Sequence, residues 1–305
     1  MAVMEGAAHQ SALFEICGLT KSFDRHRALS NVSFAIGKRE VFGILGPNGA
    51  GKTTLVRHLV GFSTGDSGRV YFLGRSIAPP ARWMRGYVGY MPQAAAALNH
   101  MTCEQALYYT ARIRGLTRAE AQHAADRLLD LWEIADRRRS DSATLSGGET
   151  RLLRLAVTMI GDPNVLVLDE PTAHMDARYR RRVHRILAEL SKTTTIVIVT
   201  HDVREASSIL DRAVLLSGGR LQAIGSPKQL RDSVGPLFAV HATSVESQAQ
   251  DVLELLELRQ IDEDQWNGLV DERDLERLRQ LQADGRLSLT STPATLEEVT
   301  VGLAS

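Results

Sequence analysis

A glycine-rich stretch from Gly46 to Thr54, GPNGAGKTT, fits the pattern G-x-x-x-x-G-K-[ST] between a strand-like and a helix-like segment. Glycines let the backbone wrap around a phosphate chain with its amide N–H groups pointing inward, and the helix N-terminus adds a positive dipole end. In such a loop the Lys52 ammonium reaches the β- and γ-phosphates, and the Thr53 hydroxyl binds Mg²⁺. The alternative is a glycine-rich turn that binds nothing. The residues expected at the phosphates are Gly46, Pro47, Asn48, Gly49, Ala50, Gly51, Lys52, Thr53 and Thr54.

Two carboxylates, Asp169 and Glu170, stand at the end of the apolar run VLVLDE. Short runs rich in Val and Ile are typical of strands buried on both faces of a parallel sheet, and open α/β sheets bind ligands at the carboxyl ends of such strands. There Asp169 can bind Mg²⁺, and Glu170 can orient or deprotonate an attacking water. The alternative interpretation of the pair is a solvated strand end before Pro171.

Two further polar residues are weaker candidates when each is taken alone. His201 ends a second buried run, TTIVIVTHD, at the same sheet edge, which favours a γ-phosphate contact over a purely structural role. Gln93, in YVGYMPQ, stands just before a helical region and in isolation would be an ordinary loop residue.

The stretch TLSGGET, Thr144 to Thr150, has the form of a helix start, because Ser146 and Glu149 make a capping-box pattern ahead of RLLRLAVTMI. Two glycines in a first helical turn each cost about 0.8–1 kcal/mol relative to alanine. A cap is worth roughly 1 kcal/mol, so capping alone does not explain Gly147 and Gly148. Without a Cβ, they would let a phosphate approach the backbone amides. We expect the Glu149 side chain to be held back on the Ser146 amide.

Composition narrows the class of protein. The chain has 305 residues, 44% of them hydrophobic, and its formal net charge is zero, which argues against a globally basic nucleic-acid binder. Two isolated cysteines fit a reducing compartment and make no metal pattern. The N-terminus lacks the basic region followed by an apolar run that predicts a cleaved signal. No run of the sequence approaches the roughly 20 apolar residues of a membrane span.

The order of strand-like and helix-like segments predicts an α/β protein. The helical ARYRRRVHRILAEL lies between the runs VLVLDE and TTIVIVTHD, which gives a βαβ unit. Three helix-like segments without strands suggest an inserted helical subdomain at about residues 94–160. We expect the main domain at residues 11–230 and a small α+β appendage at residues 231–305, with two strands and two helices before a final TLEEVTVGL helix opened by Thr295 and Glu298.

Taken together, the motifs of the sequence resemble those of the ATP-binding subunit of ABC transporters. In chain order they are GPNGAGKTT, Gln93, LSGGE, VLVLDEP, Asp176 and His201. The resemblance covers about residues 12–230, and it implies a P-loop NTPase core with an antiparallel β subdomain and the helical insert. It implies two cassettes arranged head to tail, as a homodimer or a paired cassette, with ATP between the P-loop of one and the LSGG helix of the other.

The resemblance also implies roles for individual residues. Glu170, His201, Gln93 and Lys52 would be catalytic, and Thr53, Gln93 and Asp169 would hold Mg²⁺. Ser146, Gly147, Gly148 and Asp176 would contact ATP from the partner cassette. Phe23 occupies the place of the aromatic that stacks on adenine, where Tyr is commoner. His174 and Met175 depart from the usual residues before Asp176, and Glu149 stands where Gln or Met is frequent.

Three functional classes compete for such a cassette. A transport ATPase would pair with a separate integral-membrane permease and lie peripherally on the cytoplasmic face of the membrane. A soluble translation ATPase carries two cassettes in one chain, and a DNA-repair ATPase carries a long coiled coil; this sequence has neither, so we expect transport and no nucleic-acid partner. The segment GSPKQLRDSVG and the appendage resemble ABC-2-type export cassettes, such as those for drugs, polysaccharides or lipids. An importer cassette with a regulatory C-terminal domain is the alternative.

Overall fold

The computed structural model describes residues 12–24, 26–93, 100–202, 208–233, 237–245, 247–256, 258–262 and 264–294. The predicted capping box of Thr295 and Glu298 lies outside these residues. None of the helices within the described ranges is both long and apolar enough to cross a membrane.

A six-stranded sheet forms the centre of the larger part of the chain. Its strand order is β10 (Arg220–Gly225), β9 (Arg212–Ser217), β3 (Val41–Leu45), β8 (Thr195–Thr200), β7 (Val165–Asp169) and β6 (Val88–Met91). The strands from β9 to β6 run parallel, and β10 pairs antiparallel at the edge. Every residue of β3, β7 and β8 is buried, which confirms the prediction of strands covered on both faces.

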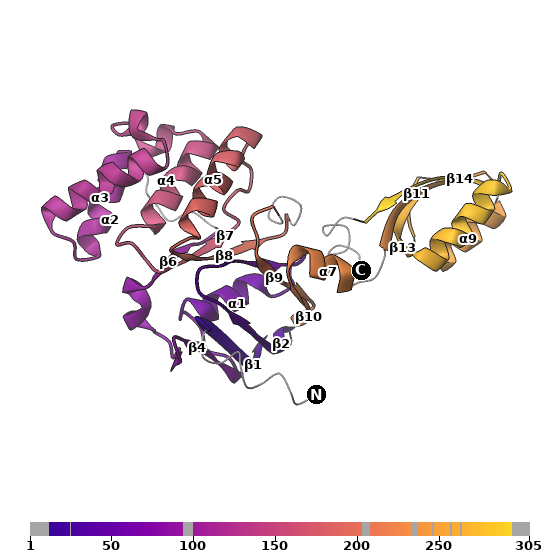
Figure 1. Ribbon diagram of the computed structural model, residues 1–305, viewed down its shortest axis with the longest axis horizontal. Helices are drawn as coiled ribbons and strands as arrows, with labels where there is room; N and C mark the ends of the chain where they lie inside the picture. Colours follow the sequence, from indigo (N-terminus) through magenta and orange to yellow (C-terminus); the bar gives the residue numbers. More distant parts are fainter. Residues whose placement is uncertain are drawn as a thin grey trace.

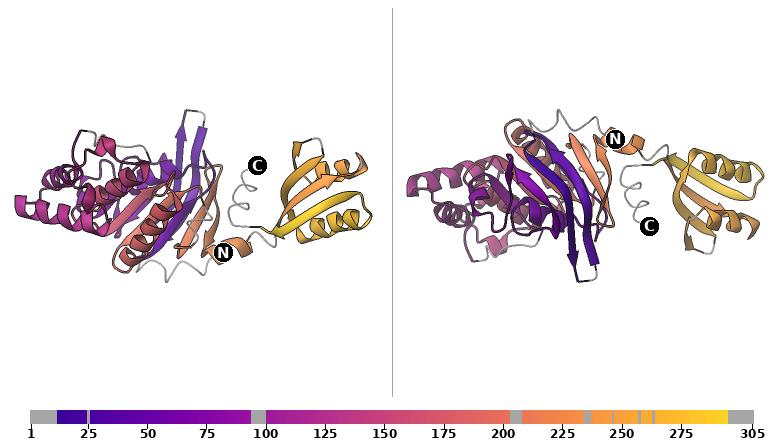
Figure 2. Two further views of the ribbon diagram at one scale, coloured as in Figure 1. Left: turned by 90° about the horizontal axis from the view of Figure 1, so that it is seen from above. Right: turned by 90° about the horizontal axis from the view of Figure 1, so that it is seen from below.

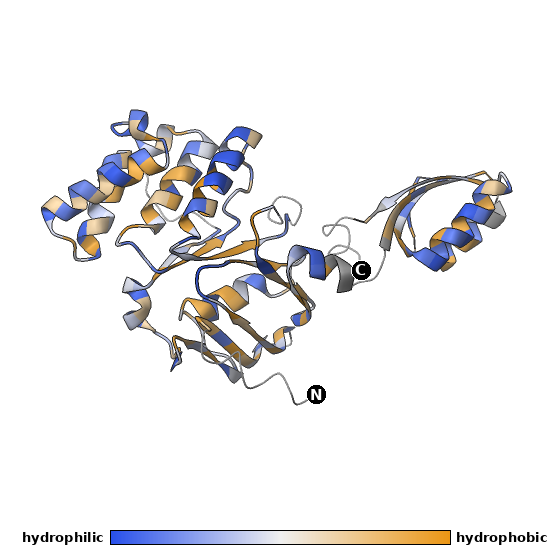
Figure 3. Ribbon diagram, in the orientation of Figure 1, coloured by the Kyte–Doolittle hydropathy of each residue, from blue (hydrophilic) through white to orange (hydrophobic). Residues whose placement is uncertain are grey.

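Each face of this sheet packs against a different layer. Phe42 and Ile44 of β3 belong to one core, together with α1 (Lys52–Leu59) and an antiparallel sheet. That second sheet has the order β2 (His26–Ile36), β1 (Phe14–Phe23), β4 (Ser67–Phe72) and β5 (Arg75–Ser76). Val41 and Leu45 face the other core, which the helices on the opposite side complete (Figure 1). In Figure 3 hydrophobic residues follow the strands and the inward faces of the helices.

The predicted helical insert is present. It consists of α2 (Cys103–Ile113), α3 (Arg118–Leu131) and α4 (Gly147–Thr158), with short 3₁₀ turns at Ala135–Arg137 and Ser142–Thr144 between α3 and α4. A further 3₁₀ turn, Arg82–Gly86, precedes β6. All three α-helices begin with a complete capping box, at Thr102, Thr117 and Ser146. The helix α5 (Ala177–Leu190) connects β7 to the parallel β8, so the predicted βαβ unit is confirmed.

Two arginines of α5 contact a carboxylate of the helical insert. Arg182 forms an ion pair of 2.9 Å with Glu133, and Arg185 contacts the same carboxylate. Glu133 lies just after α3 and has a positive φ of 54°. These arginines therefore tie α5 to the helical insert.

A separate four-stranded sheet follows α7 (Pro227–Ser233). Its elements are β11 (Leu237–Ser244), α8 (Ser247–Leu255), β12 (Arg259–Asp262), β13 (Gln265–Asp271), α9 (Glu272–Ala283) and β14 (Leu287–Pro293). The antiparallel order β12-β13-β11-β14 and the βαββαβ succession make a ferredoxin-like unit. It has its own apolar core around Trp266, Leu253 and Leu278, and Figures 1 and 2 show it to one side of the rest.

The sequence-based division of this appendage needs one correction. The sequence pattern predicts two strands and two helices, whereas β12 and β13 add a hairpin between the helices. All four residues of β12 are exposed, and Gly268 interrupts β13, so neither segment carries a strong strand pattern. The class α+β holds, and the boundaries at residues 11–230 and 231–305 stay predictions.

Candidate functional site

The glycine-rich loop connects β3 to α1 and needs its glycines for backbone geometry. Gly46, Gly49 and Gly51 have φ values of 150°, 81° and 97°. A Cβ on Gly46 would lie 2.2 Å from the Leu216 carbonyl oxygen, and one on Gly51 would lie 2.3 Å from the Ala28 carbonyl oxygen. Gly49 has open space where a Cβ would stand. The loop therefore combines an obligatory backbone path with one position that is open to a ligand.

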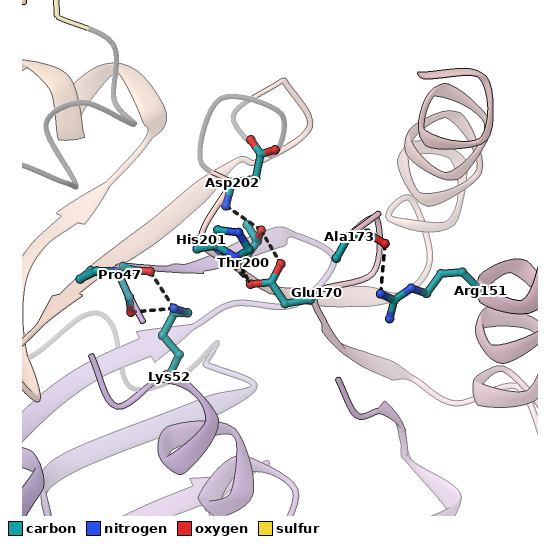
Figure 4. A network of polar contacts seen from close by, with 9 residues as sticks. Pro47, Lys52, Arg151, Glu170, Ala173, Thr200, His201 and Asp202 are labelled. Atoms are coloured by element: carbon teal, nitrogen blue, oxygen red, sulfur yellow. Dashed lines mark hydrogen bonds and ion pairs between the residues drawn. The ribbon is translucent and has the colours of Figure 1, made fainter. Parts of the chain in front are cut away.

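Lys52 is the first residue of α1 and is buried under the loop. Its Nζ donates to the carbonyl oxygens of Gly46 at 2.7 Å and Pro47 at 2.9 Å (Figure 4). Burial lowers the pKa of Lys52, while the nearby charges of Glu170 and Asp169 oppose that shift. The ammonium thus lies within the electrostatic reach of both predicted carboxylates.

A cavity of about 350 Å³ opens beside the loop. Most of the sequence-predicted ligand residues line it: Phe23, Asn48, Gly49, Ala50, Gly51, Lys52, Thr53, Thr54, Gln93, Asp169 and Glu170. His26 and Ala28 also line it, and no sequence motif indicates them. His26 is the register partner of Phe23 across the β1–β2 hairpin, so the pattern of the hairpin is the signal that could have identified it. The cavity has the size of a small-molecule site.

Asp169 ends β7, almost fully buried at 2% exposed. Desolvation and the neighbouring Glu170 raise the pKa of Asp169 to about 6, against the opposing charges of Lys52 and Arg151. Its Oδ2 is buried and has no hydrogen-bond partner among the described residues. A carboxylate oxygen of this kind fits a hard divalent cation such as Mg²⁺.

Glu170 is held in one orientation by the end of the neighbouring strand. Its backbone N–H donates to the Val199 carbonyl at 2.8 Å, although its φ of 52° is unusual for a residue with a side chain. Its carboxylate accepts from Thr200 Oγ1 at 3.1 Å and from the His201 N–H at 3.0 Å, and it lies 2.6 Å from His201 Nδ1. Figure 4 shows these groups converging on Glu170. The structure therefore joins two of the predicted residues directly.

Gln93 and Phe23 are exposed residues that line the cavity. The Gln93 carbonyl oxygen accepts from Arg154 Nη2 at 3.3 Å. Phe23 is 46% exposed, and Lys21 Nζ lies 5.5 Å from its ring centroid. An exposed ring that lines a cavity is available for stacking on a planar ligand.

The LSGG segment lies at the start of α4 and does not line this cavity. Ser146 N–H donates to Glu149 Oε2 at 2.9 Å, and Glu149 N–H donates to Ser146 Oγ at 3.3 Å. The expected position of Glu149 is therefore confirmed. Arg137 Nε also donates to Glu149 Oε1 at 2.8 Å, a contact that the sequence did not indicate. The backbone bond from Ser146, with further help from Arg137, lowers the pKa of Glu149.

The two glycines after Ser146 have different surroundings. A Cβ on Gly148 would lie 2.5 Å from the ring of Tyr179, whereas a Cβ on Gly147 would meet nothing within 4 Å. Gly148 thus has a packing reason within the chain, and only Gly147 remains open to an approaching group. Asp176 caps α5 by accepting from Arg178 N–H at 2.9 Å and Tyr179 N–H at 3.0 Å, with His174 before it at φ 61°.

Comparison with known sequences finds one matching family, and relatives that are ATP-binding proteins of export or of import. The sequence profile of the family "ABC transporter" matches residues 29–173. The Nod factor export ATP-binding protein I of Rhizobium sp. strain N33 is 34% identical over 217 residues, covering 71% of this chain and 71% of the relative. The sulfate/thiosulfate import ATP-binding protein CysA of Brucella melitensis is 38% identical over 229 residues. That match covers 73% of this chain but only 64% of the length of CysA.

Solved structures share the fold of the larger part. The structure of cbiO1 from Clostridium perfringens, described as part of an ABC transporter complex, has a TM-score of 0.66 at 27% identity and covers 72% of this chain and 91% of its own. A dimeric, ADP- and phosphate-bound ATP-binding cassette, MJ0796, has a TM-score of 0.65 at 21% identity and covers 70% and 98%.

The two glycines give a matched pair for a stability experiment. We expect Gly148→Ala to lower the free energy of unfolding by about 1–3 kcal/mol, because its Cβ would enter the space of the Tyr179 ring. Gly147→Ala, the control, adds its Cβ in open space and should change stability by less than about 1 kcal/mol. Urea denaturation measures both, and equal unfolding midpoints for the two variants would contradict the packing role of Gly148.

The raised pKa of Asp169 predicts a pH-dependent effect of its removal. The folded, ligand-free protein holds this proton more tightly than the unfolded chain, where the pKa is 3.8. The corresponding stability is therefore complete below about pH 4 and is lost as the pH rises through about 6. Asp169→Asn stays neutral, so it should be more stable than the parent at about pH 7.5, with a smaller gain at about pH 5. Urea midpoints at both pH values test this; a gain independent of pH would contradict it.

Proposed function

The chain belongs to the ABC transporter family, and we propose that it is the ATP-hydrolysing subunit of such a transporter. One observation carries the proposal: Glu170 is fixed by the end of β8 at the edge of the same cavity that the glycine-rich loop and Lys52 line. A phosphate-binding loop alone would serve many nucleotide-binding proteins. A loop with an oriented carboxylate beside it can also place a water molecule for attack on a phosphorus atom.

The described residues supply the parts of a phosphoryl-transfer site. The loop amides and Lys52 bind the β- and γ-phosphates of ATP, and the exposed ring of Phe23 stacks on adenine. Mg²⁺ would be held by Thr53, Gln93 and Asp169, and it would neutralise phosphate charge. Glu170 orients the attacking water and accepts its proton, while His201 contacts the γ-phosphate and positions Glu170 through their shared hydrogen bonds.

ATP also acts as a bridge between two cassettes in this proposal. None of Ser146, Gly147, Gly148 and Asp176 is among the residues that line the chain's own cavity, and the space beside Gly147 is open. We propose that these residues contact ATP bound to a second copy or a paired cassette, and the dimeric state of the MJ0796 cassette, which shares the fold, supports such a pairing. ATP binding closes the pair, hydrolysis reopens it, and the movement drives a separate integral-membrane permease at the cytoplasmic face of the membrane.

For the direction of transport, we propose export. The supporting observation is the similarity to the Nod factor export protein, of which the match covers 71%. Import remains a second candidate because the CysA relative has the higher identity, 38%. The transported compound follows from neither relative.

Glu170→Gln tests the proposed activity. The amide keeps the size of the side chain and can still accept a hydrogen bond, but it cannot take a proton from water. We expect ATP binding within about threefold of the parent and turnover at least about a hundredfold lower. With ATP and Mg²⁺ the variant should accumulate as a dimer in size-exclusion chromatography. Lys52→Ala, the comparison variant, should lose ATP binding itself. Parental turnover by Glu170→Gln would overturn the assignment.

The direction of transport has a separate test. We expect the membrane protein that copurifies with the chain to be a permease with about six membrane-spanning helices. Each of these helices should contain about 20 predominantly apolar residues. Reconstituted together with the chain in vesicles, an exporter moves its compound away from the ATP-containing side. ATP-dependent movement toward that side, dependent on a solute-binding protein, would establish import instead.

A further inference from the structure

Two arginines of α4 reach the two loop segments that border the candidate site. Arg151 and Arg154 stand three residues apart, so their side chains leave the same side of the helix. Their neighbours Leu152, Leu153 and Leu155 are buried in the core, which fixes the helix beneath them. Neither arginine was among the residues that the sequence indicated.

Arg151 contacts the segment between β7 and α5. Its Nη2 donates to the Ala173 carbonyl oxygen at 3.1 Å, within the turn that leads from Glu170 to the Asp176 cap (Figure 4). The guanidinium is also near enough to Asp169 and Glu170 for their charges to oppose the lowering of its pKa by burial. Its Nη1 is buried without a hydrogen-bond partner among the described residues.

Arg154 contacts the other segment. Its Nη2 donates to the carbonyl oxygens of Pro92 and Gln93, the second at 3.3 Å. Burial lowers the pKa of Arg154, with Arg151 as the second cause. Hydrogen bonds from a charged donor are stronger than those between neutral groups, so each arginine fixes the backbone that it contacts.

We propose that Arg151 and Arg154 are positioning residues that couple the Ser146 end of α4 to the Glu170–Asp176 segment and to Gln93. The inference rests on the proposed function and adds a route within one chain. A phosphate that contacts Ser146 and Gly147 pulls on the start of α4. Because the helix is a rigid, core-packed element, the pull reaches both loops through the two guanidinium groups. The chain's own site is thereby adjusted by the ligand of the neighbouring cassette.

Local backbone protection gives a readout that needs no ATP turnover. In hydrogen–deuterium exchange on the full chain, Arg151→Met should speed exchange in peptides covering residues 171–176 and leave those covering 88–93 unchanged. Arg154→Met should do the opposite. Arg181→Met, an exposed arginine of α5, is the control and should change neither. Faster exchange throughout the chain, or no change at either segment, would overturn the coupling.

Steady-state kinetics separates positioning from binding. We expect Arg151→Met to lower kcat by about tenfold with KM within about threefold, because ATP contacts remain while the turn that follows Glu170 loses its hydrogen bond from Arg151. Arg151→Lys keeps a charged donor and should lose less. Parental kcat in Arg151→Met, in a preparation where Glu170→Gln is inactive, would overturn this inference alone. A parent chain without ATP turnover would overturn the proposed function and, with it, the catalytic part of the inference.

Discussion

The parallel pairing of β3, β8 and β7 is the constraint on which the rest of the site depends. Leu45 is the register partner of Thr200, and Asp169 is the partner of Val199, so three chain segments leave the sheet at the same edge. All three strands are buried on both faces. A slip in pairing by one residue would therefore turn each side chain toward the opposite core. The sheet thus determines that the glycine-rich loop, the carboxylates and His201 meet. The hydrogen bonds from Thr200 and His201 to Glu170 then connect the end of β8 to the residue that follows β7.

The parts of this arrangement that follow from local pattern could be predicted, and those that depend on distant contacts could not. The bounds of α5 and the capping box at Ser146 follow from periodicity and from residues within one helical turn. Arg137 reaches Glu149 from a 3₁₀ turn, and this contact has no local signature. His26 lies opposite Phe23 in the β1–β2 hairpin, so only recognition of that hairpin could have identified it. The hairpin of β12 and β13 could not be predicted because its local pattern is weak. Every residue of β12 is exposed, and Gly268 interrupts the sequence of β13.

Gly148 illustrates how one residue type can have two explanations. The pair of glycines after Ser146 suggested a single cause, the approach of a phosphate to bare amides. Tyr179, on another helix, supplies a different cause for one of them, since its ring occupies the space that a Cβ would need. Gly147 keeps the original explanation as a proposal. The two neighbouring glycines at the start of this helix therefore have different explanations: packing against another helix for Gly148, and the proposed approach of a phosphate for Gly147.

The capping box and a phosphate contact at Ser146 are compatible, although both use the same side chain. In the capping box Ser146 Oγ accepts from the Glu149 N–H, and a hydroxyl retains one hydrogen to donate. The Ser146 hydroxyl can therefore donate to a phosphate oxygen without giving up the cap. Glu149 would bring a like charge to that phosphate, but its carboxylate is held by the Ser146 amide and by Arg137 at 2.8 Å. Arg137 offsets the charge, so the residue that completes the cap does not have to repel the ligand.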